Sequence, residues 1–276
     1  IPLRLVGSEM CIRDRHKRAK AVSRVLMGLS VAILIGNPLA TWLGQSVSWR
    51  YAFALVSVIA LATVAMIALL LPVDRSEVRS SPISELRAFN RAPIWLALGI
   101  GSIGFAGMFC VFSYMAPTLL EVTRVSPGMI PVAMAIFGVG CILGNMAGGW
   151  LFDRLQFKSV AWILLWSALV LLVLPVATQS IWTMLPAILA LGTIAALSPA
   201  LQTHLMDVAT GAQTLAAASN HAAFNIANAL GPWLGGLAIS AGFGWTSTGY
   251  IGAATAVAGL LVFTWAWKVQ KAQKTA

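Results

Sequence analysis

The sequence predicts an all-α membrane protein with eight transmembrane helices. Of its 276 residues, 59% are hydrophobic and 9% are charged, whereas ordinary soluble domains have roughly 45–50% and ~25%. A 29.2 kDa chain that folds as one water-soluble globule cannot bury that much apolar surface. This composition excludes a soluble enzyme, a nucleic-acid-binding domain and a disordered chain. Long apolar runs and the positions of the basic residues support the same fold class.

The first fifteen residues, IPLRLVGSEMCIRDR, carry five charges and no sustained apolar run, so they are not a signal peptide. The piece VGSEMCIRDR resembles the translated read-through of a sequencing adapter. We therefore expect 1–15 to be an artefactual lead-in; the alternative is an ordinary cytosolic segment.

Eight apolar runs are long enough to cross a bilayer as helices, which takes ~20 residues. They lie near 21–45, 50–72, 94–118, 128–152, 159–178, 182–203, 213–240 and 247–267. Backbone amides within lipid must be hydrogen-bonded inside the protein, and the strands of a transmembrane barrel would alternate polar with apolar residues. The runs show no such alternation, so we predict helices.

The basic residues indicate how these helices are oriented. Thirteen Lys and Arg residues lie before the first run, after the second and fourth runs and at the end of the chain, whereas only Arg50 and Arg124 lie in the opposite set of loops. Cytoplasmic loops of membrane proteins carry an excess of Lys and Arg. Both termini are therefore predicted to be cytoplasmic. The net charge of +10 is a topology signal and gives no reason to expect a nucleic-acid partner.

An internal repeat predicts the architecture. Residues 37–44 read NPLATWLG and residues 228–235 read NALGPWLG, which match at five of eight positions with an offset of 191. Chance similarity between two helices rich in Leu and Gly is the alternative. The two segments lie in the first and seventh runs, so the repeat spans six helices, as in transporters built from two related halves.

On this reading the first run is helix five of twelve, and four helices are absent from the N-terminal side. Residues 16–72 then form the last two helices of the N-terminal half. Residues 73–93 form a cytoplasmic linker rich in Ser, Pro and charge. Residues 94–276 form a complete six-helix C-terminal half.

Three stretches resemble the major facilitator superfamily, and within it the drug:proton antiporter branch that includes arabinose-efflux-permease-like proteins. They are GNPLATWLGQ at 36–45 followed by Trp49-Arg50, GWLFDR at 149–154, and 220–236, which begins with Asn-His and ends with NALGPWLGG. These resemble, respectively, the family's helix-five antiporter motif, its loop between helices eight and nine, and its helix eleven. The resemblance covers residues 16–276.

Two departures from the family pattern are visible. The helix-five segment has Asn37-Pro38 in place of Gly-Pro, and the loop has Gln156 and Phe157 where the family places Gly and a basic residue. They weaken the antiporter label more than the superfamily label. The resemblance implies a 6+6 helical fold in the bacterial inner membrane.

The third run carries an aromatic stripe with one hydroxyl. Ser102, Phe105, Phe109 and Phe112 are spaced 3, 4 and 3 residues apart, so they share a helix face. Such a stripe is either ordinary bulk that faces lipid or, as the resemblance implies for helix seven, a cavity wall for amphipathic drugs or sugar rings.

The fourth run carries the gating candidates. Gly140, Gly144 and Gly148 recur every four residues on one face, where small residues permit close helix packing; they either serve packing alone or also let a gating helix reorient. Asp153 and Arg154 end this run. The Asp153 carboxylate could accept hydrogen bonds from the amides of a neighbouring helix start, and the resemblance implies an intracellular gate; a simple topology-setting charge is the alternative.

The seventh run is the most polar. His221, Asn225 and Asn228 lie at i, i+4 and i+7, so they share one face, which we expect to turn to the protein interior. Ionisable residues within membranes usually mark functional sites, and His221 can titrate near neutral pH. It is either a proton-coupling residue or a neutral histidine bonded to a neighbouring helix. Asn37 is the repeat mate of Asn228.

No enzyme is predicted. The sequence contains no Gly-Lys-Ser/Thr phosphate loop, and His204 beside Asp207 is expected to cap a helix end in a cytoplasmic loop. Three widely spaced cysteines make neither a disulfide framework nor a metal site. We therefore expect no cofactor and no metal.

The predicted function is secondary active transport: proton-coupled efflux of a small organic molecule, a drug or a sugar. The expected partners are this substrate, protons and the lipid bilayer, and the expected state is a monomer. The alternatives are a polytopic membrane protein that does not transport and a facilitator-type uptake permease.

Overall fold

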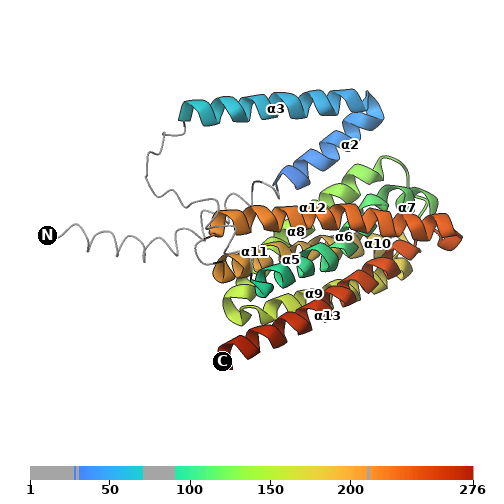
Figure 1. Cartoon of the computed structure of the whole chain (residues 1–276). Coiled ribbons are helices and arrows are strands. Elements are labelled where there is room, and N and C mark those ends of the chain that lie inside the picture. Colours follow the sequence, from blue (N-terminus) through green and yellow to red (C-terminus); the bar gives the residue numbers. More distant parts are fainter. Residues whose placement is uncertain (1–27, 29–30, 71–90, 210–211, 276) are drawn as a thin grey trace.

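A computed structural model describes residues 28, 31–70, 91–209 and 212–275 (Figure 1), and these contain helices and no strand. The predicted lead-in 1–15 and residues 73–90 of the predicted linker lie outside the described residues. The helices are η1 (Ala32–Gly36), α2 (Asn37–Ser46), α3 (Trp49–Leu70), α5 (Ala92–Gly104), α6 (Ala106–Ser113), α7 (Met115–Glu121), α8 (Met129–Leu155), α9 (Lys158–Ala177), α10 (Ile181–Thr193), η2 (Ile194–Ala196), α11 (Leu197–Val208), α12 (Gln213–Ala238), η3 (Ile239–Phe243) and α13 (Ser247–Thr275).

Seven helical stretches among the described residues are long and apolar enough to cross a membrane. They are Trp49–Leu70, Ala92–Ser113, Met129–Leu155, Lys158–Ala177, Ile181–Val208, Leu215–Phe243 and Ser247–Ala272. Each corresponds to one of the predicted runs from the second to the eighth. The first run is described only in part, as η1 and α2, so the all-helical membrane fold is confirmed but the count of eight is not.

Helices α5 to α13 form a bundle with a large apolar core and a smaller buried apolar cluster. Helix α13 packs along α9 and α5, α8 packs on α10, and α12 packs on α5 and α6 (Figure 1). The core side chains Ile100, Leu164, Leu171 and Leu191 are all 0% exposed. Helices η1 and α2 pack on α8, whereas α3 packs on α2 and runs apart from the bundle, along its outside.

The regular α-helix is interrupted shortly before a proline in three of the predicted runs: the first, the third and the sixth. Proline cannot donate a hydrogen bond to the carbonyl four residues before it. Pro38 removes the α-helical donor to the Leu34 carbonyl, and the chain at this point forms the π-helix η1. Pro117 acts in the same way on Ser113, next to the break at Tyr114 between α6 and α7. The described parts of these runs are helical, as predicted, with a local irregularity before each proline.

The sixth run breaks for the same reason. Pro199 cannot donate to the carbonyl of Ala195, and the chain tightens there into the short 3₁₀ segment η2 between α10 and α11. Short 3₁₀ turns relieve this mismatch because their hydrogen bonds span three residues instead of four.

The predicted glycine face of α8 lies against the backbone of α10 and η2. A Cβ atom on Gly144 would lie 2.6 Å from the Thr193 carbonyl oxygen, and one on Gly148 would lie 2.7 Å from the Ala196 Cα. A Cβ on Gly140 would meet the Leu189 carbonyl oxygen. Close packing by these glycines is therefore confirmed, and their partner is the interrupted helix α10–η2.

We predict that Gly144→Ala destabilises the protein and that Gly149→Ala does not. A Cβ atom at Gly149 meets no atom within 4 Å, and both substitutions gain the same helix propensity. Overpacking at Gly144 should cost about 1–3 kcal/mol. The check is thermal unfolding of both variants in detergent, followed by tryptophan fluorescence; equal midpoints would refute the close contact.

Candidate functional site

The polar residues of α12 lie on the surface of the bundle. His221, Asn225 and Asn228 are all exposed, so the prediction that this face is buried in the protein is not met within the described residues. Among the described side chains of α12, the buried polar one is Asn220, which is 1% exposed. We name His221, Asn225 and Asn228 the polar stripe.

A second exposed stripe of α12 is apolar. Its members are Ala222, Ile226, Ala229, Trp233 and Leu237, all exposed. Successive residues of an α-helix are about 100° apart, so the polar stripe lies between this apolar stripe and Phe224. Large exposed apolar side chains are what a lipid-facing surface carries. A polar surface at membrane depth usually faces a water-filled cavity or another part of the protein.

Phe224 connects the polar stripe to the aromatic residues of the third run. Its ring lies 4.8 Å from that of Phe105, and Phe105 lies 5.3 Å from Phe109, edge to face. Phe112 instead packs on Phe137 of α8, at 4.6 Å. The four predicted residues of this run therefore do not form one lining.

Their exposure separates the residues of this run further. Phe105 is 5% exposed and belongs to the core, which corrects its assignment to a cavity wall. Ser102, Phe109 and Phe112 are half-buried. The polar stripe on α12 and Phe109 on α6 are linked through the rings of Phe224 and Phe105, whereas no described contact joins Ser102 of α5 to them.

Asn37 is not brought to the polar stripe by a described contact. It is half-buried at the start of α2, and its carbonyl oxygen accepts a hydrogen bond from the Thr41 hydroxyl at 2.8 Å. Helices η1 and α2 pack on α8. At Gly138 of α8 a Cβ atom would lie 2.6 Å from the Leu34 Cα, so this is another close glycine contact.

The gating candidates Asp153 and Arg154 are exposed at the end of α8. The Arg154 guanidinium lies over the Trp150 ring, 4.2 Å from its centroid. Gln156 ends the helix with φ at 50°. Among the described residues, no hydrogen bond from a backbone amide to the Asp153 carboxylate is found, so the expected capping role has no support there.

His204 lies in a different environment from the one expected. It is within α11 and is 6% exposed, not in a loop. Its ring stacks on Phe157 with centroids 3.9 Å apart, and its Nε2 lies 3.1 Å from Gln270 Nε2 of α13. The sequence signal that could have indicated this is the apolar spacing of Leu197, Leu201 and Leu205, which continues the helix past residue 203.

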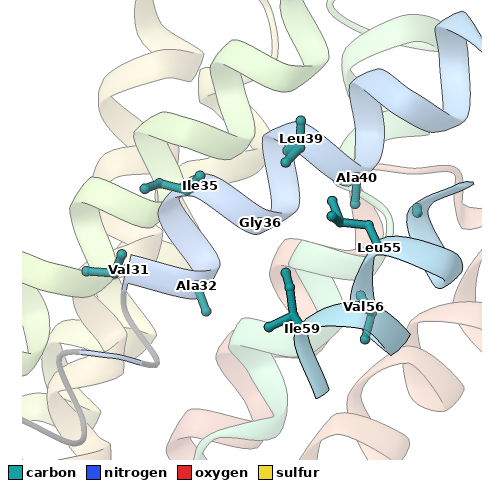
Figure 2. A pocket seen from close by; sticks show the side chains of 10 residues that line it. Val31, Ala32, Ile35, Gly36, Leu39, Ala40, Leu55, Val56 and Ile59 are labelled. Carbon is teal, nitrogen blue, oxygen red and sulfur yellow. The ribbon is translucent and has the colours of Figure 1, made fainter. Parts of the chain in front are cut away.

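An apolar groove lies between η1–α2 and α3 (Figure 2). Its volume is about 280 Å³, and its lining residues are Val31, Ala32, Ile35, Gly36, Leu39, Ala40, Ala52, Leu55, Val56 and Ile59. This lining has no polar side chain, so it offers no ligand for a metal and no catalytic group. Among the described residues, no group of three or more His, Cys, Asp or Glu residues is placed to hold a metal ion.

We predict that the two exposed stripes of α12 differ in access to water. In a chain whose Cys11, Cys110 and Cys141 are replaced by Ala, Asn225→Cys should react with a charged thiol reagent several times faster than Ile226→Cys. Both side chains are exposed, so the difference reports the medium, because thiolates form in water and not in lipid. Equal rates in membrane vesicles would show that both stripes face the same medium.

Comparison with known proteins gives the family. The Major Facilitator Superfamily matches residues 12–156 and 98–276. The inner membrane transport protein YdhP of Escherichia coli (strain K12) is 34% identical over 253 residues, which are 90% of this chain and 64% of that protein. The chain thus spans less than two thirds of the length of this relative.

Two further relatives have lower sequence identity and are matched over a smaller share of their own length. The putative transporter AraJ of Escherichia coli (strain K12) is 32% identical over 82% of this chain and 58% of its own length. The probable sugar efflux transporter of Pasteurella multocida (strain Pm70) is 28% identical over 91% of this chain and 62% of its own length. These relatives are membrane transporters and not enzymes, and the chain belongs to the major facilitator superfamily.

Proposed function

We propose that the protein is a secondary active transporter that exports a small organic molecule, a drug or a sugar, in exchange for protons. Membership of the major facilitator superfamily supports transport. The printed name of the Pasteurella multocida relative, a probable sugar efflux transporter, supports the direction and a sugar-like substrate. The segment 36–45, which resembles the family's helix-five antiporter motif, supports exchange with protons.

The observation that carries this proposal is the split surface of α12. An exposed helix that faced lipid all around would be apolar all around, yet one flank of α12 carries His221, Asn225 and Asn228. The two amides can donate and accept hydrogen bonds with hydroxyl groups. The neighbouring half-buried Phe109 offers an apolar ring surface for a sugar or an aromatic drug.

His221 is the ionisable residue of α12. An imidazole can gain and lose a proton, so proton uptake by His221 from the periplasmic side and its release to the cytoplasm would couple substrate export to proton influx. A protonated His221 next to Asn225 would also alter which hydrogen bonds the stripe offers to the substrate.

We further propose the topology and assembly that this function needs. Eight spans place both termini in the cytoplasm of a bacterium, as the excess of Lys and Arg in alternate loops supports. The spans correspond to helices five to twelve of a 6+6 fold, and α2 with α3 belongs to the first half. The protein acts as a monomer in the inner membrane, and Asp153 with Arg154 contributes to the cytoplasmic gate.

The test compares His221→Gln with His221→Leu. Everted membrane vesicles from cells that express the protein are energised so that their lumen becomes acidic, and uptake of a labelled sugar or an amphipathic dye is measured. Both variants should lose uptake driven by the proton gradient, because neither side chain can titrate. Ala222→Leu, on the adjacent apolar stripe, should retain it.

Two outcomes would contradict the proposal. Full activity of His221→Gln with loss only in His221→Leu would mean that the side chain serves packing. Substrate that equilibrates equally with and without a proton gradient in the wild-type protein would indicate a facilitator and not an antiporter.

A further inference from the structure

Two buried amide side chains have hydrogen-bonding atoms that no described residue satisfies. Asn220 of α12 is 1% exposed, and neither its Oδ1 nor its Nδ2 has a partner among the described residues. Gln202 of α11 is 7% exposed, and its Oε1 likewise has no partner among the described residues. Buried polar groups in proteins are almost always bonded to protein or to ordered water. These two side chains therefore require a partner that the described residues do not supply.

Two levels of apolar contact join α5, α11 and α12. At the first level one buried cluster joins all three helices; it consists of Ile94, Ala97, Leu205, Ala209 and Ala216. This cluster lies near the start of α5 and the connection from α11 to α12.

The second level lies one to two helical turns farther along the bundle. A Cβ atom on Gly101 of α5 would lie 3.5 Å from Leu201 Cδ1 and 3.6 Å from Ala223 Cβ. Gln202 follows Leu201 directly, and Asn220 lies one turn before Ala223. Along α11 and α12, both amides therefore fall between these two levels of contact.

We propose that Asn220 and Gln202 bind buried water between α5, α11 and α12. Water can donate hydrogen bonds to Asn220 Oδ1 and Gln202 Oε1 and accept one from Asn220 Nδ2, which satisfies every unpartnered atom of the pair. Leu201, Leu205 and Ala216, which take part in the contacts between these helices, are 0% exposed. A site for one water needs only about 10–15 Å³.

This hydrated site is separate from the polar stripe. Asn220 immediately precedes His221, but neighbours on a helix point about 100° apart, so one side chain enters the three-helix contact while the other is exposed. The inference is independent of the proposed function, because it rests on burial and hydrogen bonding alone and holds for any substrate or direction of transport.

A double-mutant cycle tests whether the two amides share a partner. Asn220→Leu and Gln202→Met change shape little, and each should lower the midpoint of thermal unfolding by about 2–4 °C, because each leaves the other amide with a poorly satisfied atom. The double variant should lose much less than the sum. Asn220→Leu combined with Thr255→Val, in α13, is the control pair and should be additive.

The cycle can also overturn the proposal. If no water is bound, each single substitution removes an unsatisfied buried group and should raise the midpoint. If the two effects simply add, the amides share no partner. Either result contradicts a common hydration site.

A second measurement on the wild-type chain needs no variant to fold. Hydroxyl radicals formed by X-ray radiolysis of bound water oxidise the side chains beside that water. Leu201 and Leu205 should be oxidised severalfold more than Leu164 and Leu171, although all four are 0% exposed. Equal oxidation of the two pairs would overturn the proposal, even if the cycle showed coupling, because coupling would then report a direct contact between the amides.

Discussion

Helices in a bilayer gain little from apolar contact with each other, because lipid chains are as apolar as leucine side chains. Their association depends instead on how closely the backbones can approach. In this bundle the approach is set by glycine: Gly144 of α8 lies against the Thr193 carbonyl, and a Cβ on Gly231 of α12 would meet the carbonyl of Ala106 in α6. In the same way, a Cβ on Gly104 of α5 would lie 3.5 Å from the Gly259 Cα of α13. At three helix–helix contacts, the close approach of the backbones thus depends on glycine, which has no side chain.

Close packing of this kind places the irregular backbone where it is covered. The 3₁₀ segment η2 lies behind Gly144 and Gly148 of α8, so its weaker hydrogen bonds are enclosed by protein. Irregular backbone at membrane depth is tolerated in such positions and not against lipid. In the third run, which is also interrupted, the Tyr114 hydroxyl donates a hydrogen bond to the Pro232 carbonyl oxygen of α12 at 2.9 Å. This bond ties the break between α6 and α7 to the neighbouring helix.

The polar stripe and the hydrated pair are two different uses of polar residues on one helix. His221, Asn225 and Asn228 lie on an exposed flank, where water or a substrate can reach them, whereas Asn220 enters a contact between three helices. Spacing within the sequence indicated the shared face of the first three. It could not indicate which flank of α12 packs on α5 and α6, because the apolar residues of the two other flanks are alike in composition.

The sequence by itself determined the fold class. With 59% hydrophobic residues, the chain must place its long apolar runs in lipid, and because these runs lack the alternation of barrel strands, only helices can satisfy their backbone hydrogen bonds there. It also determined the glycine face of α8, since a four-residue spacing is a local property of a helix. The tertiary structure decided the rest. It decided that Phe105 is core and Phe109 half-buried, that His204 stacks on Phe157, and that Pro117 and Pro199 accompany breaks while Pro175, Pro186 and Pro232 lie within helices. These outcomes depend on which side chains of a neighbouring helix lie opposite each residue. That neighbouring helix comes from a distant part of the chain, so local sequence does not identify it.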